Sequence, residues 1–199
     1  MPGGKAVFIN VPFDAGYESL FVTLVGTLTF LGQEPHCVLE VGETGEGRLA
    51  RIFELMRSCR VSVHDLSRSG NPVRFNMPFE LGLACALKLT SPADYEIFVL
   101  DGRPFRADRT LSDYKGRDPL IHNGTNDGML GCVLDMFTPV VGYAASSFRN
   151  AAKELRKVTQ ALKADLRATS VFRPAMFRLL VNAASRIAME RGFIPPRER

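Results

Sequence analysis

The segment from Arg60 to Lys88, RVSVHDLSRSGNPVRFNMPFELGLACALK, holds the residues with the clearest capacity for chemistry. A short apolar run ends in Asp65, a polar loop follows, and a helix is predicted to begin near Pro78, with Glu80 in its first turn. Carboxylates can transfer protons or stabilise positive charge that develops during a reaction. We therefore take Glu80 and Asp65 as the candidate catalytic residues.

Both carboxylates also have ordinary structural explanations, which stay open at this point. A carboxylate in the first turn stabilises the positive end of a helix by about 0.3–1 kcal/mol, and Asp65 is equally explained as a loop carboxylate or a helix cap. Gly82 is harder to explain, because a glycine inside a helix costs about 1 kcal/mol relative to alanine. Its presence suggests that another backbone or a ligand approaches the helix there.

The elements that must position these residues alternate along the first two thirds of the chain. Short apolar runs predict strands at 6–10, 35–39, 61–64 and 96–100, and amphipathic runs predict helices over 17–31, 49–58 and from 78 onward. Strands this short and apolar, each followed by a helix, indicate an α/β fold with a parallel sheet covered on both faces. Beyond residue 118 the pattern predicts a short strand at 119–122, a helix over 128–137, and a helical hairpin formed by 147–168 and 174–191.

Ligands of an open parallel sheet bind beyond the carboxyl ends of its strands. That rule selects the loops 11–16, 40–48, 65–76 and 101–113, which carry the strand-end carboxylates Asp14, Glu40, Asp65 and Asp101. Polar loop ends are common in globular proteins, so these positions alone define no mechanism.

The arrangement of motifs resembles a known group of enzymes. The first strand leads into Asn10-Val11-Pro12-Phe13, the third strand ends in Asp65, and Asn76-Met77-Pro78-Phe79-Glu80-Leu81-Gly82 opens an alanine-rich helix. Over about half the chain this layout resembles nucleoside 2-deoxyribosyltransferases and the related Toll/interleukin-1-receptor-like (TIR-like) domains of bacteria. The resemblance implies a three-layer, flavodoxin-like parallel sheet, with the C-terminal helical hairpin as an addition.

The resemblance also implies roles for the two acids. In those families a glutamate at this position is the nucleophile or the ribose-orienting carboxylate in cleavage of an N-glycosidic bond, which implies that role for Glu80. Such cleavage passes through an oxocarbenium-like centre, which a carboxylate stabilises or captures. Asp65 would then hydrogen-bond the base or help to protonate it.

The remaining site predictions concern substrate binding. Phe13 would stack on the base or the sugar, with Asp14 beside it, and Asn76 would bind a ribose hydroxyl. Arg48 would receive a phosphate together with the backbone amides of a glycine-rich loop that contains Gly42, Gly45 and Gly47. Arg74 stands where the transferases keep an acid, which favours a nucleotide or NAD over a plain deoxynucleoside.

Each of these residues has an alternative interpretation. Phe13 is also explained as a core residue, and Arg48 and Arg74 as surface charges. His64 alternates with two valines and is typical of a packed strand residue. Asp113 and His122 lie in segments whose polar sequences are not typical of simple connecting loops. We expect these residues to close the substrate pocket or to contact a second subunit.

Composition and charge limit the remaining possibilities. The chain has 199 residues, 46% of them hydrophobic and 23% charged, which is a globular balance with no apolar run long enough to span a membrane. Its four cysteines and three histidines are scattered singly, so we expect no metal site, no cofactor and a reducing, cytoplasmic location. Residues 149–199 carry 12 Lys and Arg against 4 Asp and Glu, which we interpret as a solvated helical face, with no nucleic acid or membrane partner.

Two hypotheses follow for domains and function. We expect an α/β core at 1–142 and a C-terminal helical extension at 143–199, packed on the core or joining two subunits as a homo-oligomer. The first hypothesis is an enzyme, a hydrolase or ribosyltransferase that cleaves the N-glycosidic bond of a nucleotide, NAD or nucleoside. The alternative is a non-catalytic TIR-like module that senses a nucleotide or binds a protein.

Overall fold

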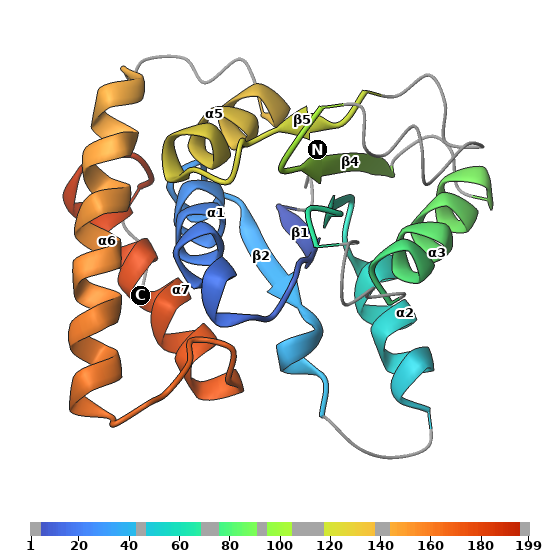
Figure 1. The fold of residues 1–199 in the computed structure, drawn as a ribbon, viewed down its shortest axis with the longest axis horizontal. Helices are drawn as coiled ribbons and strands as arrows, with labels where there is room; N and C mark the ends of the chain where they lie inside the picture. The colour runs from blue at the N-terminus through green and yellow to red at the C-terminus, as the bar shows by residue number, and fades with distance from the viewer. Residues whose placement is uncertain are drawn as a thin grey trace. The chain divides into compact units, whose positions relative to one another are not determined.

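The computed structural model describes residues 5–42, 47–68, 76–90, 95–104, 118–137 and 144–195. Strands and helices alternate through the first part of this chain, and three helices end it (Figure 1). The strands are β1 (Ala6–Asn10), β2 (Glu34–Cys37), β3 (Val61–Asp65), β4 (Glu96–Asp101) and β5 (Leu120–Ile121). The helices are α1 (Glu18–Phe30), α2 (Arg48–Ser58), α3 (Asn76–Thr90), α5 (Asn126–Met136), α6 (Ala145–Asp165) and α7 (Pro174–Glu190), with single 3-10 turns η1 (Ala15–Tyr17) and η2 (Val38–Glu40).

The described strands form one parallel sheet in the order β2-β1-β3-β4-β5. This is the strand order of flavodoxin-like sheets, and it confirms the predicted α/β class with a parallel sheet. In the register of the sheet, Asn10 of β1 pairs with His64 of β3, and Asp65 pairs with Leu100 of β4. The polar residues at the ends of β1, β3 and β4 therefore meet at one edge.

The chain divides into two compact units, and each is built from separate stretches of sequence. The first unit contains Met1–Pro12 and His36–Gly124, and the second contains Phe13–Pro35 and Thr125–Arg199. This division differs from the predicted boundary between residues 142 and 143, because α1 and α5 pack with the two C-terminal helices. Residues 138–143, which hold that boundary, lie outside the described residues.

In the first unit, α2 and α3 cover one face of the sheet. The core there is made of apolar residues from alternate strand positions and from the inner sides of the two helices: Phe8, Ile52, Met56, Cys59, Leu66, Met77, Leu81, Ala84, Leu87, Tyr95, Ile97 and Val99. Because strand side chains alternate between faces, Phe8, Asn10 and His64 share the face that α2 and α3 cover. This packing fixes the start of α3 close to the ends of β1 and β3.

In the second unit, α1 is the central helix. Every residue from Phe21 to Phe30 is buried, and α5, α6 and α7 all pack against it. The hydroxyl group of each of its three buried threonines donates to the carbonyl oxygen four residues earlier in the helix. Thr27, for example, donates to the carbonyl oxygen of Thr23 at 2.7 Å. Gly26 allows α6 to approach, since a Cβ there would overlap the buried side chain of Leu155. The two predicted C-terminal helices are present and pack on each other.

None of the described helices is long and apolar enough to cross a lipid bilayer.

Candidate functional site

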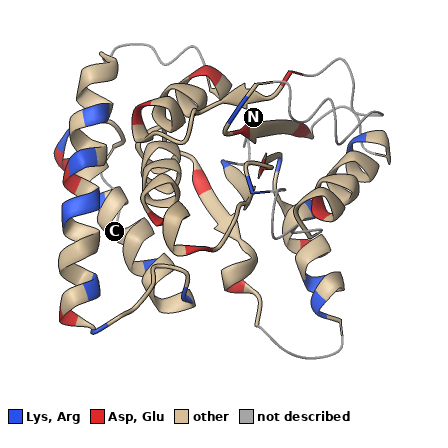
Figure 2. Cartoon of the chain, viewed as in Figure 1, with Lys and Arg blue, Asp and Glu red and all other residues tan. Residues whose placement is uncertain are grey.

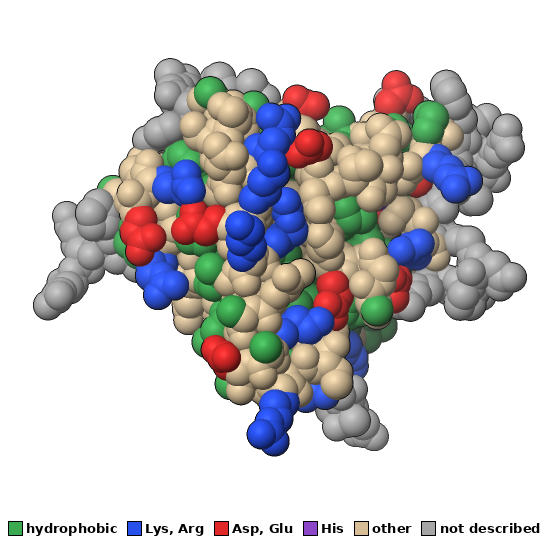
Figure 3. Space-filling model, turned by 60° about the vertical axis from the view of Figure 1, so that its left-hand side comes forward, with side chains coloured by type: hydrophobic (Ala, Val, Ile, Leu, Met, Phe, Trp, Pro, Cys, Tyr) green, Lys and Arg blue, Asp and Glu red, His purple; other side chains and the backbone are tan. Residues whose placement is uncertain are grey.

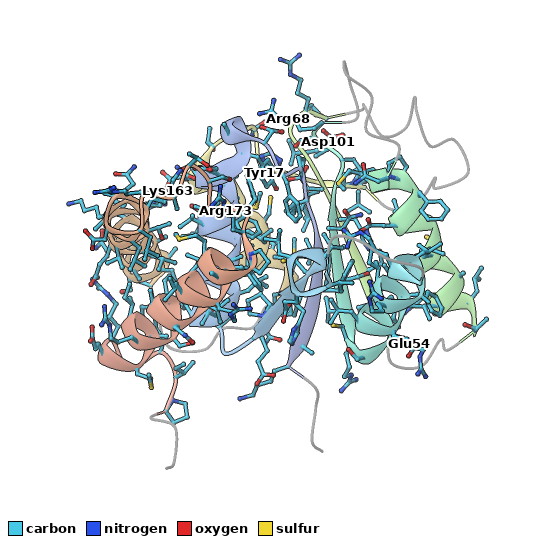
Figure 4. All side chains as sticks on the ribbon, turned by 90° about the horizontal axis from the view of Figure 1, so that it is seen from below. Tyr17, Glu54, Arg68, Asp101, Lys163 and Arg173 are labelled. Atoms are coloured by element: carbon cyan, nitrogen blue, oxygen red, sulfur yellow. The ribbon has the colours of Figure 1, made fainter. Side chains whose placement is uncertain are left out.

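The carboxyl edge of the sheet gathers the polar groups of the first unit. β3 and β4 both end there, and Figure 4 shows Arg68 and Asp101, which follow or close these strands, at the same end of the sheet. In the chain, α2 follows β2 and α3 follows β3, and the first turn of α3 lies against the end of β1, where Nδ2 of Asn10 donates to the carbonyl oxygen of Met77. Polar side chains at these strand ends and side chains in the first turns of these helices therefore lie near one another.

Glu80 is a buried carboxylic acid in the second turn of α3. Only 7% of the residue is exposed, and its Oε2 has no hydrogen-bond partner within the described part of the chain. Burial raises the pKa of Glu80 to about 7, while the positive charge of Arg48 acts in the opposite direction. A carboxyl group with this pKa exchanges its proton at neutral pH and keeps an oxygen available.

Arg48 lies at the start of α2, and part of its guanidinium is hydrogen-bonded to the loop that precedes the helix. Its Nη1 donates to the carbonyl oxygens of Val41, at 3.3 Å, and of Gly42, at 3.1 Å. Gly47, just before it, has a φ of 80°, a left-handed conformation that glycine adopts without strain. The structure thus brings Arg48 within electrostatic reach of Glu80, and its predicted role in phosphate binding stays a prediction.

A buried hydrogen-bond network joins β1, β3 and α3. The Nδ2 of Asn10 donates to the carbonyl oxygen of Met77 at 3.1 Å and lies 3.1 Å from Nδ1 of His64. Since an amide nitrogen can only donate, His64 accepts at Nδ1 and carries its proton on Nε2. Burial lowers the pKa of His64 to about 3, so the ring is neutral. Its Nε2 has no hydrogen-bond partner among the described residues.

Among the described residues, four buried polar atoms without a hydrogen-bond partner lie on this side of the sheet: Ser62 Oγ, Tyr95 Oη, His64 Nε2 and Glu80 Oε2, of which the last two are at the carboxyl edge. Met77 and Glu80 are three residues apart on the buried side of α3, so Glu80 follows the network by one helical turn. Unpartnered buried polar atoms are costly and few in folded proteins. The Nε2 proton of His64 and the Oε2 of Glu80 are therefore a donor and an acceptor that a bound molecule could satisfy.

Sequence reasoning missed this network. It favoured packing over an acid–base role for His64 and gave Asn10 no role of its own, although Asn10 is the one polar residue in the run AVFIN. An amide that ends a buried strand beside a helix start is the signal that could have identified it.

Asp65, which was predicted to hydrogen-bond or protonate the base of a substrate, is engaged with groups of the protein itself. Its Oδ1 accepts the backbone N–H of Ser67 at 2.7 Å, and its Oδ2 lies 3.1 Å from Nε2 of His122. The N–H of Gly124 donates to Nδ1 of His122 at 3.0 Å, which fixes the ring proton on Nε2, toward Asp65. Both carboxylate oxygens face donors, an arrangement that suits an ionised group.

Asp65 and Glu80 lie on opposite faces of the sheet at its carboxyl edge. Consecutive residues of a strand point to opposite faces, so Asp65 turns away from the face on which His64 meets α3. The structure therefore pairs Asp65 with His122 and groups Glu80 with Arg48, Asn10 and His64. The joint action of the two predicted acids stays a prediction.

Phe13 and Asp14 belong to the second unit. The half-buried ring of Phe13 stacks on Phe172, with centroids 5.0 Å apart, and meets Phe21 edge-on at 6.1 Å. This packing favours the interpretation of Phe13 as a core residue. The backbone oxygen of Asp14 accepts the N–H of Tyr17 at 2.9 Å, in the turn that leads into α1. Their predicted roles in substrate binding are untested.

Other predicted site residues are exposed or lie outside the described part. Asn76 is exposed at the start of α3, where its predicted contact with a ribose hydroxyl stays a prediction. Arg74, Asp113 and Gly45 lie outside the described residues. Gly82 is exposed, and a Cβ there would meet nothing within 4 Å in the described chain, so no backbone approaches it.

The described residues contain no group of three or more His, Cys, Asp and Glu that could hold a metal ion. The four cysteines, all of them in the described ranges, form no disulfide with one another. Burial raises the pKa of the Cys59 thiol to about 11 and that of Cys37 further still, so neither is a reactive thiolate at neutral pH.

Comparison with protein-family models, with curated proteins and with solved structures finds no match for this chain.

Proposed function

We propose that this protein is an enzyme that cleaves the N-glycosidic bond of a nucleotide, NAD or a nucleoside, with Glu80 as the catalytic carboxylate. The observation that carries the proposal is the buried carboxyl group of Glu80, which has an unpartnered oxygen and a pKa raised to about 7. Purely structural carboxylates at a helix start are exposed to solvent or accept hydrogen bonds from the helix. Glu80 instead keeps an oxygen free at the edge where ligands of parallel sheets bind.

The proposed reaction uses the ionised form of Glu80. As the bond between the base and the anomeric carbon breaks, the base leaves with the bonding electrons and the sugar develops an oxocarbenium-like charge. The carboxylate of Glu80 stabilises this charge or bonds to the anomeric carbon, and water or a second free base then attacks that carbon and releases the sugar from Glu80. Arg48, whose charge lowers the pKa of Glu80, favours the ionised form at the start of the reaction.

The neighbouring groups have supporting roles in this proposal. The Nε2 proton of neutral His64 would donate to a hydroxyl or ring atom of the substrate, and Asn10 holds the ring in that tautomer. Asp65, with both oxygens facing donors, would organise the strand ends, while the leaving base takes its proton from water. The resemblance to deoxyribosyltransferase-like and TIR-like proteins remains part of the proposal.

The direct test is release of free base. Purified protein is incubated with NAD, with a nucleoside monophosphate and with deoxynucleosides, and the products are separated by chromatography. We expect base release by the wild type, a loss of about 100-fold or more in Glu80→Gln, and a rate that rises with pH through about 7 as Glu80 ionises.

A matched control is Glu54→Gln, which changes an exposed glutamate on α2 (Figure 4). This variant should keep the wild-type rate. Full activity in Glu80→Gln would remove Glu80 from the mechanism. No base release from any of these substrates, with the protein folded, would contradict the enzyme and favour the nucleotide-sensing or protein-binding module.

A further inference from the structure

The second unit contains a pocket of its own, lined by residues of η1, α1, α6 and the turn before α7. Its volume is about 320 Å³, at the lower end of the range typical of small-molecule sites. The lining residues are Ala15, Glu18, Ser19, Val22, Arg156, Thr159, Gln160, Lys163 and Val171. All of them belong to the helical unit, so this pocket is separate from the residues around Glu80.

Arg156 is the distinctive group in this pocket. It is half-buried, and its Nη1 donates to the hydroxyl oxygen of Thr23 at 3.0 Å. No carboxylate of the described chain lies within ion-pair distance of it, and burial lowers the pKa of its guanidinium. A guanidinium has five N–H donors, so most of those of Arg156 stay available to a ligand.

The acids nearby are already neutralised by other partners. The Oε2 of Glu18 accepts from Nζ of Lys163 at 2.5 Å, and its Oε1 accepts the N–H of Val171 at 3.1 Å. Asp127, whose charge acts on Arg156, forms its ion pair with Arg149 at 3.0 Å. The pocket therefore carries one positive charge in excess, located at Arg156.

The walls of the pocket are of two kinds. Ala15 is exposed and offers apolar surface, and the almost fully buried Val22 and Val171 line the pocket behind it, whereas Ser19 and Gln160 offer polar atoms beside Arg156. This combination fits a molecule with one anionic group and a small apolar body. Inorganic ions alone would leave the apolar surface uncovered.

Positive charge on α6 also favours the approach of anions. Lys and Arg recur along α6 in Figure 2, and Figure 3 shows them gathered in a column on the face that α6 presents. The basic residues of α6 are Arg149, Lys153, Arg156, Lys157 and Lys163, against Glu154 and Asp165. Clustered charge of one sign raises the local concentration of oppositely charged ligands.

We propose that the pocket between α1 and α6 binds a small organic anion, whose carboxylate or phosphate group is held by Arg156 and whose apolar body packs against Ala15. Arginine recognises both kinds of oxyanion through paired N–H donors. This proposal is independent of the proposed cleavage of N-glycosidic bonds, because the pocket belongs to a different unit and the test measures ligand binding and not base release.

The test is isothermal titration of the full-length protein with benzoate, phenyl phosphate and the neutral analogue benzyl alcohol. We expect saturable 1:1 binding of at least one anion, at least about tenfold tighter than that of benzyl alcohol, because a charge-assisted hydrogen bond contributes roughly that factor. The tighter of the two anions identifies the preferred oxyanion. Binding of neither anion, or equal binding of benzyl alcohol, would overturn the proposal.

Variants locate the binding. Arg156→Gln should weaken anion binding about tenfold or more, and Arg156→Lys, which keeps a positive charge, should fall between it and the wild type. Lys157→Gln removes the neighbouring charge, which does not line the pocket, and should change the affinity by less than about twofold. Thermal unfolding confirms that each variant is folded. Wild-type affinity in folded Arg156→Gln would overturn the assignment.

Discussion

His122 faces Asp65 at the carboxyl edge of the sheet, with its Nε2 3.1 Å from Oδ2 and both side chains almost fully buried. The two residues are 57 positions apart in the sequence. They meet because β3, β4 and β5 are adjacent parallel strands that end at the same edge. A backbone N–H from Gly124 fixes the tautomer of the histidine, so the pair is held from both sides.

The first prediction concerns the stability that this pair provides. His122→Ala removes one partner of the Asp65 carboxylate and the acceptor of the Gly124 N–H, and should lower the free energy of unfolding by about 1–3 kcal/mol. Urea denaturation measures this change. His36→Ala is the control, since the pair of His36 with Glu40 is half-exposed and its loss should cost less than about 1 kcal/mol. Equal effects of the two variants would contradict a structural role for the pair.

The second prediction concerns the pH dependence that Glu80 imposes. Its pKa is about 7 in the folded protein and near the ordinary 4.5 in the unfolded chain. Between these values the folded protein binds the additional proton, so the free energy of unfolding should fall as the pH rises from 4.5 through 7. Glu80→Gln should remove this fall and raise stability above pH 7, by about 3 kcal/mol at most.

Denaturation curves from pH 4 to 9, compared with those of Glu54→Gln, check this expectation. If Glu80→Gln and the wild type show the same pH profile, the carboxyl group is not buried in a way that disfavours its charge.

The third prediction compares two glycines inside helices. Gly82→Ala should stabilise the protein by about 0.5–1 kcal/mol, because its position on α3 is exposed and has open space for a methyl group. Gly26→Ala should destabilise it by about 1–3 kcal/mol, because the methyl group would overlap Cδ2 of Leu155, a fully buried side chain that must shift within a packed core. The midpoints of urea unfolding give both values. A stabilised Gly26→Ala would show that α1 and α6 pack less closely than described.

Gly82→Ala also tests the remaining part of the sequence interpretation. If a ligand approaches α3 at this glycine, the variant should lose base release while gaining stability. Unchanged base release would show that Gly82 has no role in ligand binding and only lowers the stability of α3.

The fourth prediction concerns acid sensitivity of the helical unit. Burial raises the pKa of Glu18, but the hydrogen bonds from Lys163, Ser170 and Val171 more than offset this and hold the pKa below its ordinary value of 4.5. A lowered pKa stabilises the folded state above pH 4.5, and this contribution is lost as the pH falls below that value. Glu18→Gln should therefore make stability less dependent on pH below 4.5, whereas Glu190→Gln, on the surface of α7, should not. Circular dichroism during acid titration distinguishes the two.

Local patterns predicted most of the elements but not their grouping. The run AVFIN predicts a strand over 6–10, and β1 has those bounds, while the helix expected over 17–31 extends from Glu18 to Phe30. The predicted boundary near residue 142 placed α1 with the α/β core, whereas α1 belongs to the same compact unit as α5, α6 and α7. A signal was present, since residues 20–31, LFVTLVGTLTFL, contain apolar residues at positions on every side of a helix, which is typical of a helix buried all round.

The candidate site was predictable only in part. Glu80 could be selected because its type and position are visible in the sequence. Its burial depends on the packing of α3 on the sheet, and the partners of Asp65 and His64 depend on strand order and register, which no local pattern encodes. His122 was recognised as unusual, but the sequence offered no means to connect it with Asp65.

The placement of α1 has a consequence for how this chain reaches its native state. The helix is synthesised early, yet the helices that cover its apolar surface come more than a hundred residues later. Contacts between segments so distant in sequence form slowly and expose apolar surface until they are made. A nascent or prematurely terminated chain that ends before α6 would present α1 uncovered, so we expect such fragments to aggregate or to be bound by chaperones until the final helix emerges from the ribosome.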